Sequence, residues 1–303
     1  MRRYIKLLAI ITIISGSGLA AAENEGKTGL AFLKVGVDAR ASGMGEAYTA
    51  AANNAFAAYW NPAGLMGAGR SNVVFMHNEW LFDVNGEFGA LQFRSSKASL
   101  AFHLYTFNVG DIEVRSIPSE LPLETTGANY LSAGVSYARR LGSRLDAGIT
   151  AKYLYEKIFF ESAGGLALDL GLLYRGLLPN LTLGGTVQNL GEMGEFKDEA
   201  TTLPKIARLG AQYVFPQPFG PAGLLLAADL VKPFDENLRG HFGAEAALWK
   251  QLMLRFGYMA GYESRSFSAG LGIHKSFIHL DYSYSPFRDD LGDGHRFSLY
   301  LAL

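Results

Sequence analysis

The side chains able to bind ions or react occur mostly on one side of segments in which polar and apolar residues alternate. Such a row of ionisable groups could form an ion path or a ligand site. Burying unpaired charges is unfavourable, so we expect the groups to form ion pairs with one another. They are Asp146, Lys152, Glu156, Asp169, Arg175, Arg208, Asp229, Glu245, Arg255, Asp281 and Arg296.

Reactive motifs are absent from the sequence. The six histidines have no zinc-like spacing, and the lack of cysteine excludes disulfides, thiolate metal sites and a lipoprotein anchor. No Gly-x-Ser-x-Gly motif occurs, although a phospholipase built from a lone Ser and His on different strands stays open as an alternative. The pairs Gly164-Gly165 and Gly184-Gly185 lack the Lys-Ser/Thr of a phosphate loop, so we interpret them as strand kinks. We predict no catalytic residue, metal site or cofactor.

Composition favours a membrane protein built from strands. Charged residues make up 18% of the chain, glycine accounts for 36 of 303 residues, and the net charge of -1 provides no basic field for nucleic acid. After residue 22 no apolar run reaches the roughly 20 residues of a spanning helix. Hydrophobicity must therefore be distributed periodically.

Strand periodicity of two recurs along the chain. Leu166, Leu168 and Leu170, for example, alternate with Ala167 and Asp169. About fourteen such segments occur, most of a length that crosses a bilayer when tilted. They are 71–80, 85–94, 98–107, 129–140, 144–156, 166–175, 181–190, 207–215, 222–232, 239–248, 252–261, 267–274, 277–285 and 295–303. Residues 108–128, 191–203 and 286–295 are predicted to be longer loops.

Alternation also fits a soluble β-sandwich with an inward apolar face. Three features favour a membrane barrel. Strands follow one another without covering helices, in an even number that can close without an edge. The polar face carries Gly, Ser and Thr with charges of both signs, as a lumen would, and aromatic residues cluster near strand ends. We predict an all-β fold, a transmembrane antiparallel barrel of about 14 strands that spans residues 71–303.

Export is predicted from the first 22 residues. A basic start at Met1 to Lys6 precedes an apolar run and a small-residue stretch that ends at Ala22. This order is typical of a signal peptide, and the apolar run is too short for a membrane anchor. We predict a signal peptide at 1–22 and a location in the bacterial outer membrane, with outer-membrane lipid as a partner.

Residues 23–70 do not alternate. The stretch 42–58 is rich in alanine and glycine and predicts one or two short helices, whereas Asn61-Pro62 and Gly64 predict a tight, rigid turn. A segment of this size can lie within a barrel that would otherwise enclose a channel. We predict a plug at 23–70, in which Arg40 and Glu46 pair with each other or with the barrel wall. Contact with a substrate is the alternative role of these two residues.

The plug residues also carry a family resemblance. Asp38-Ala39-Arg40-Ala41-Ser42-Gly43-Met44-Gly45-Glu46-Ala47-Tyr48-Thr49-Ala50, followed by Trp60-Asn61-Pro62-Ala63-Gly64-Leu65, resembles the opening motif of the PorV/PorQ family, which is related to FadL-type fatty-acid transporters. The resemblance implies a fourteen-stranded barrel with a hatch at 43–65. The hatch residues it singles out are Arg40, Gly43, Gly45, Glu46, Trp60, Asn61, Pro62 and Gly64.

The resemblance leaves two non-enzymatic functions open. One is a PorV/PorQ-like component of type IX secretion or surface attachment, with secretion-system proteins or secreted substrates as partners. The other is a FadL-like channel for hydrophobic small molecules. We favour the first, because the Arg-Ala-Ser-Gly-Met-Gly-Glu-Ala motif is closer to that branch.

Overall fold

The computed structural model describes residues 28–115, 122–196, 199–219, 222–249 and 251–303. The predicted signal peptide, residues 1–22, lies outside them.

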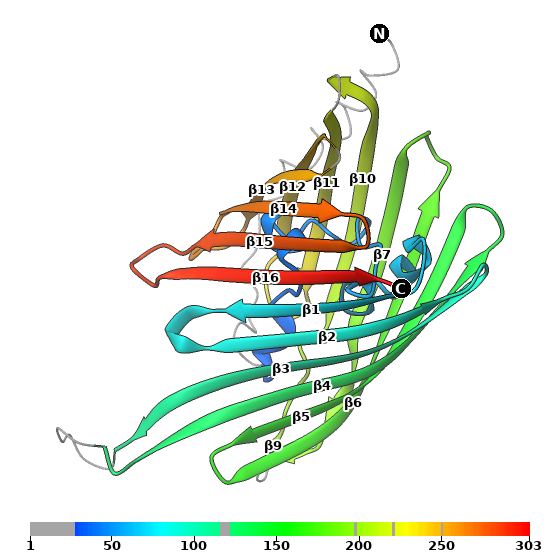
Figure 1. The fold of residues 1–303 in the computed structure, drawn as a ribbon. Coiled ribbons are helices and arrows are strands. Elements are labelled where there is room, and N and C mark those ends of the chain that lie inside the picture. Colours follow the sequence, from blue (N-terminus) through cyan, green and yellow to red (C-terminus); the bar gives the residue numbers. More distant parts are fainter. Residues whose placement is uncertain (1–27, 116–121, 197–198, 220–221, 250) are drawn as a thin grey trace.

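Strands that follow one another in sequence pair side by side and form a closed antiparallel barrel (Figure 1). β1 pairs with β16, from Asn72 opposite Ala302 to Glu79 opposite His295, so the described sheet has no free edge at its ends. The prediction of a barrel of about 14 strands is confirmed. The fourteen barrel strands are β1 (Asn72–Glu79), β2 (Asn85–Arg94), β3 (Ala98–Val114), β4 (Glu124–Leu141), β5 (Leu145–Ile158), β6 (Glu161–Arg175), β7 (Leu181–Met193), β10 (Ile206–Phe219), β11 (Ala222–Pro233), β12 (Arg239–Leu248), β13 (Leu252–Ala260), β14 (Phe267–Lys275), β15 (Ile278–Pro286) and β16 (Asp293–Ala302).

The apolar face of the strands points outward. On β6, Leu168 and Leu170 are 44% and 47% exposed, whereas Ala167 and Asp169 on the opposite face are 2% and 0% exposed. Successive side chains of a strand point to opposite faces, so the apolar residues make a continuous outer surface. An outward apolar band is typical of a barrel surrounded by lipid.

Two predicted loops contain strand. β3 and β4 continue as a two-stranded ribbon, in which Ile112 lies opposite Thr126 beyond a bulge, so most of 108–128 is not a loop. This ribbon is the arm that projects at the lower left of Figure 1. The range 191–203 likewise contains the end of β7 and the short pair β8 (Glu195–Phe196) and β9 (Glu199–Ala200). The ladder continues because β-branched residues such as Ile112 and Thr126 favour extended backbone.

The two ends of the barrel differ. At one end, here called the turn end, short connections join β2 to β3, β4 to β5, β6 to β7, β10 to β11, β12 to β13 and β14 to β15. The other end, the loop end, carries the remaining connections, most of which are longer. Short turns face the periplasm in barrels of this kind. The chain ends at the turn end, where Figure 1 marks the C-terminus.

Short helices precede the barrel, as predicted, but most of the stretch 42–58, where they were expected, forms turns and irregular backbone. They are η2 (Ala31–Lys34), α2 (Ala39–Gly43), α3 (Ala57–Trp60) and η3 (Pro62–Gly67), and a further turn, η4 (Leu81–Asp83), joins β1 to β2. Helix α2 contacts β13 to β16, and η3 contacts β2 to β6. These strands lie on different sides of the ring, so the N-terminal segment, residues 28–70, lies inside the barrel. No helix of the described residues has the length and apolarity to cross a membrane.

The outward leucines allow a test of the lipid contact. Leu168 lies halfway along β6, and Leu177, in the turn that follows, is 61% exposed. We expect Leu168→Arg to destabilise the barrel in phospholipid vesicles by about 2–4 kcal/mol, because arginine is unfavourable in hydrocarbon. Leu177→Arg is the matched control and should change stability by less than about 0.5 kcal/mol. The measurement is denaturant unfolding in vesicles, and equal stability of the two variants would contradict a lipid-facing β6.

Candidate functional site

The candidate site is the contact between the N-terminal segment and the barrel wall. The segment runs along the barrel from the loop end to the turn end. At the loop end, Lys34 Nζ lies 2.6 Å from both Asp235 Oδ2 and Glu236 Oε1. At the turn end, Arg94 Nε donates to the carbonyl of Ala68 at 3.2 Å.

Arg40 on α2 pairs with the wall. Its Nε and Nη2 atoms donate to the two carboxylate oxygens of Glu245 on β12, at 2.7 and 2.8 Å. Glu245 also accepts from Arg255 on β13, and Arg255 reaches Asp281 on β15 at 2.6 Å. Paired bonds from a planar guanidinium to a carboxylate fix orientation as well as distance. The network therefore holds α2 against three strands.

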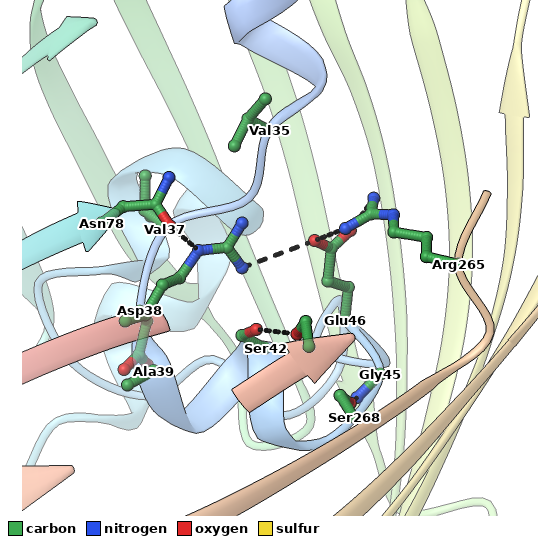
Figure 2. Close-up of polar contacts among 12 residues, drawn as sticks. Val35, Val37, Asp38, Ala39, Ser42, Gly45, Glu46, Asn78, Arg265 and Ser268 are labelled. Carbon is green, nitrogen blue, oxygen red and sulfur yellow. Dashed lines mark hydrogen bonds and ion pairs between the residues drawn. The ribbon is translucent and has the colours of Figure 1, made fainter. Parts of the chain in front are cut away.

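Glu46 is the second charged contact of the segment. Figure 2 shows its carboxylate directed at Arg265, whose Nη1 lies 3.1 Å away, while Nη1 of Arg296 lies at 3.6 Å. Arg296 in turn donates to Asn78 on β1 at 2.9 Å. Burial raises the pKa of Glu46, but the guanidinium groups of Arg265 and Arg296 outweigh it and lower this pKa to about 2. Of the two predicted alternatives, Arg40 and Glu46 therefore pair with the wall.

Asp38 is the residue immediately before α2, and its side chain is a buried carboxylate. Its Oδ1 accepts from the backbone N–H of Arg40 at 3.0 Å, which caps the helix. Burial and the neighbouring Asp281 raise its pKa to about 6. Asp38 therefore stabilises α2 as a hydrogen-bond acceptor, in contrast to the ion-paired Glu46.

Trp60 and Asn61 hold the middle of the segment together. Trp60 is fully buried, donates from Nε1 to the carbonyl of Val37 at 2.9 Å, and packs its ring 5.0 Å from the guanidinium carbon of Arg208. The Asn61 amide donates to the carbonyl of Thr49 at 2.9 Å and to that of Leu172 on β6 at 3.2 Å. Asn61 thus satisfies backbone groups of both the segment and the wall.

The Asn-Pro-Ala-Gly turn is an N-terminal cap. Asn61 Oδ1 accepts from the N–H of Ala63 at 3.2 Å, and Pro62 occupies the first position of η3. Gly64 lies against the carbonyl of Ala52, where any Cβ would collide. Gly64 therefore permits a close contact within the N-terminal segment rather than with the wall.

Gly43 and Gly45 contact the wall directly. A Cβ on Gly43 would lie 2.9 Å from the Cα of Gly270, and one on Gly45 would lie 2.7 Å from the Tyr258 nitrogen. Gly45 also has a positive φ of 62° and donates to Ser268 Oγ at 3.1 Å. Neither glycine can carry a side chain without displacing α2 from the strands.

The wall supplies glycines at the same contacts, and the sequence analysis missed their role. Gly243 and Gly257, paired on β12 and β13, lie under Met44 and Gly45, and Gly148 and Gly171, paired on β5 and β6, lie under Asn61 and Pro62. We name these lumen-side glycines the glycine floor: Gly148, Gly171, Gly184, Gly210, Gly243, Gly257 and Gly270.

Gly184, which the sequence analysis interpreted as a strand kink, has a packing role, because a Cβ there would lie 2.8 Å from the Thr49 carbonyl oxygen. Its neighbour Gly185 faces outward. The available sequence signal was the position of these glycines on the polar side of the alternation.

Most of the predicted ionisable residues do pair in the lumen. Lys152 Nζ lies 2.8 Å from Asp169, and Asp146 binds both Arg140 and Arg175. Asp229 on β11 differs, because it accepts from the backbone N–H groups of Tyr48 and Thr49 at 2.9 and 2.8 Å. In the part of the chain that the structure describes, no three His, Asp or Glu side chains gather as a metal site would require. The arrangement is suited to holding a segment.

A comparison with protein families also singles out the N-terminal segment and the first strands. The family described as "Type IX secretion system protein PorV" matches residues 20–170, which include the whole N-terminal segment and β1 to β5. The chain belongs to the PorV family. This PorV-family chain is therefore a non-enzymatic outer-membrane barrel.

Solved structures show the same fold. The toluene transporter TbuX of Ralstonia pickettii is 13% identical, with a TM-score of 0.58 over 88% of this chain and 97% of that one. The CymD monoaromatic hydrocarbon channel is 11% identical, with a TM-score of 0.63 over 89% and 98%. A Pseudomonas aeruginosa FadL homologue is 10% identical, with a TM-score of 0.55 over 87% and 97%. No curated protein matches the sequence.

The glycine floor can be tested at two adjacent positions. Gly184→Val places a side chain against Thr49, whereas Gly185→Val adds one to the outer face, where the nearest atom is Leu209 Cδ2 at 3.4 Å. We expect Gly184→Val to displace the segment and Gly185→Val to leave it in place. The measurement is the labelling rate of a cysteine introduced as Ala51→Cys, a position 2% exposed. Equal labelling in both variants would show that the floor does not hold the segment.

The Glu46 pairing predicts an acid-dependent loss of stability. A carboxyl group whose pKa is lowered on folding stabilises the protein above its unfolded value, and the stabilisation disappears as the pH falls through the folded value. For Glu46 this window lies between pH 4.5 and about 2. At pH 7, Glu46→Gln should destabilise the protein by about 3–5 kcal/mol, because it leaves buried guanidinium groups unpaired. The measurement is denaturant unfolding at pH 5 and pH 2.5. Between these two pH values, the free energy of unfolding should fall more for the wild type than for Glu46→Gln. The exposed Glu263 provides the control: Glu263→Gln should behave as the wild type at both pH values.

Proposed function

We propose that this barrel is a component of type IX secretion or surface attachment, with residues 23–70 as a plug and the loop end as the surface that contacts exported proteins. The observation that best supports this proposal is that the N-terminal segment fills the lumen. Trp60, Tyr48 and Phe56 are at most 1% exposed. A barrel whose interior is occupied in this way is suited to presenting a surface rather than to passing solutes.

The plug is anchored on opposite sides of the ring. Arg40 is held on β12, Glu46 by Arg296 on β16, and Asn61 on β6. Arg40, Gly43, Gly45, Glu46, Trp60, Asn61, Pro62 and Gly64 are accordingly its proposed anchoring residues. If one of these contacts is lost, the contacts on the other sides of the ring still hold the plug. This arrangement supports a plug that closes the barrel permanently.

The loop end supports a protein contact. Phe82 in the β1–β2 connection and Phe160 in the β5–β6 connection are 73% and 76% exposed. The ribbon of β3 and β4 adds Leu123, which is 69% exposed. Aromatic residues are enriched at protein interfaces, and these lie on the connections beyond the apolar band. We propose secretion-system proteins or their exported substrates as the partners.

A FadL-like channel for hydrophobic small molecules is the second candidate. It is supported by an apolar groove of about 610 Å³ whose lining includes Phe75, Leu104, Leu271, Ile273 and Phe297. These side chains are 42% or more exposed and point outward, so the groove opens toward lipid. A lumen route would need a cavity beside the segment, and the groove does not supply one. Because the groove lies on the lipid side, we place the channel second.

Delivery to the outer membrane completes the proposal. The order of basic, apolar and small residues in 1–22 supports export by a signal peptide that is cleaved after Ala22. Mass spectrometry of the N-terminus of the protein from outer membranes tests this part by itself.

Site-specific photo-crosslinking in the native host tests the proposed function. A photoreactive residue at Phe160 should capture secretion-system components or exported proteins, identified by mass spectrometry. The same residue at Phe277, which is 52% exposed at the turn end, should capture none of them. In planar bilayers the wild type should conduct poorly, and a variant lacking residues 40–66 should conduct ions. Efficient toluene uptake into vesicles by the wild type, without exported proteins captured at Phe160, would replace this function by the channel.

A further inference from the structure

Positive charge is concentrated at the turn end. Arg70, Lys97, Arg139, Arg144 and Lys275 are all exposed there. No ion pair among the described residues involves any of the five. We call these five side chains the cationic arc.

Carboxylates are distributed in the opposite way. At the turn end Asp146 is buried and already paired with Arg140 and Arg175. The loop end has many exposed carboxylates, among them Glu79, Glu113, Glu124, Glu161, Glu263, Asp289, Asp290 and Asp293. Within the described structure, no exposed side-chain carboxylate at the turn end therefore neutralises the arc.

The arc follows a continuous part of the rim, from β14 to the β4–β5 turn. Lys97 and Arg139 lie side by side, because Ala98 pairs with Arg139 and the Lys97 carbonyl accepts from the N–H of Arg140 at 3.0 Å. Arg144 follows in the β4–β5 turn. Arg70 precedes β1, and Lys275 ends β14, two strands away across β16 and β15. The five cations are therefore distributed along about half of the rim, from β14 through β1 to the β4–β5 turn.

We propose that the cationic arc binds anionic phospholipid headgroups in the leaflet at the turn end. Two of the cations continue lipid-facing rows of side chains. Arg139 stands two residues beyond Tyr137, which is 45% exposed, and Lys275 stands two residues beyond Ile273, which is 56% exposed. With a period of two, both cations point to the lipid side, at the level where the apolar band ends.

The placement favours lipid over an acidic protein. Long cationic side chains at the edge of an apolar band keep their stems on hydrocarbon and their charges among the headgroups. The exposed apolar residues Leu141 and Phe277, 48% and 52% exposed, extend the membrane surface between the cations. A protein in the aqueous space would meet the tips of the turns, whereas Arg139 and Lys275 lie on the strands.

Lipid binding by the full chain in detergent tests the proposal. The probes are dioleoylphosphatidylglycerol and the zwitterionic dioleoylphosphatidylcholine, titrated and counted by native mass spectrometry. The wild type should prefer phosphatidylglycerol, and added salt should weaken the preference. The triple variant Lys97→Gln, Arg139→Gln, Lys275→Gln should bind phosphatidylglycerol roughly a hundredfold more weakly, about fivefold for each cation.

The matched control removes three exposed cations from the loop end, as Lys157→Gln, Lys232→Gln, Arg288→Gln. It should bind phosphatidylglycerol like the wild type. If the turn-end triple does not fold by circular dichroism, Lys275→Gln alone should show the fivefold loss. Equal binding of the two lipids by the wild type, or equal loss in both triple variants, would overturn the proposal. Capture of an acidic protein that requires the arc, without preference for phosphatidylglycerol, would also overturn it.

Discussion

The structure depends on how closely two backbones can approach inside a closed barrel. The N-terminal segment lies directly on the strands because Gly43 and Gly45 meet Gly270 and Gly257, with no side chain on either surface. Interiors are packed to high density, so even one methyl group at such a contact must displace something. The close approach brings backbone N–H groups within reach of wall side chains, as for Asp229 below Thr49. The glycine floor thus determines which polar contacts can form.

Charge pairing adds direction to that contact. Glycines permit the segment to approach but do not specify its rotation, whereas Arg40 and Glu46 each have partners on particular strands. Breaking such a pair leaves an unpaired buried charge. The loss of stability is therefore much larger than when an exposed ion pair is broken. The two kinds of contact also differ in chemistry, because the glycine contacts are insensitive to pH and salt and the ion pairs are not.

The barrel could be predicted from the sequence because a strand between lipid and a polar lumen must alternate. The ribbon of β3 and β4 could not, since beyond the bilayer Ile112 and Thr126 no longer face two different solvents. Partners in the lumen were also beyond prediction. Arg40 and Glu245 are separated by 205 positions, and no periodicity relates them. The role of a glycine depends on what lies opposite, as the neighbours Gly184 and Gly185 demonstrate.

The segment's contacts with the last strands have a consequence for the order of folding. The N–H of Ala39 donates to Ser298 on β16, 259 positions later. Residues made first therefore reach their final partners only after the last strand has been placed. Contacts between such distant positions require a large loss of chain entropy and form slowly. The sheet closes between β1 and β16, and α2 also docks on β16. Closure of the barrel and docking of α2 therefore both depend on the last strand and occur late in folding.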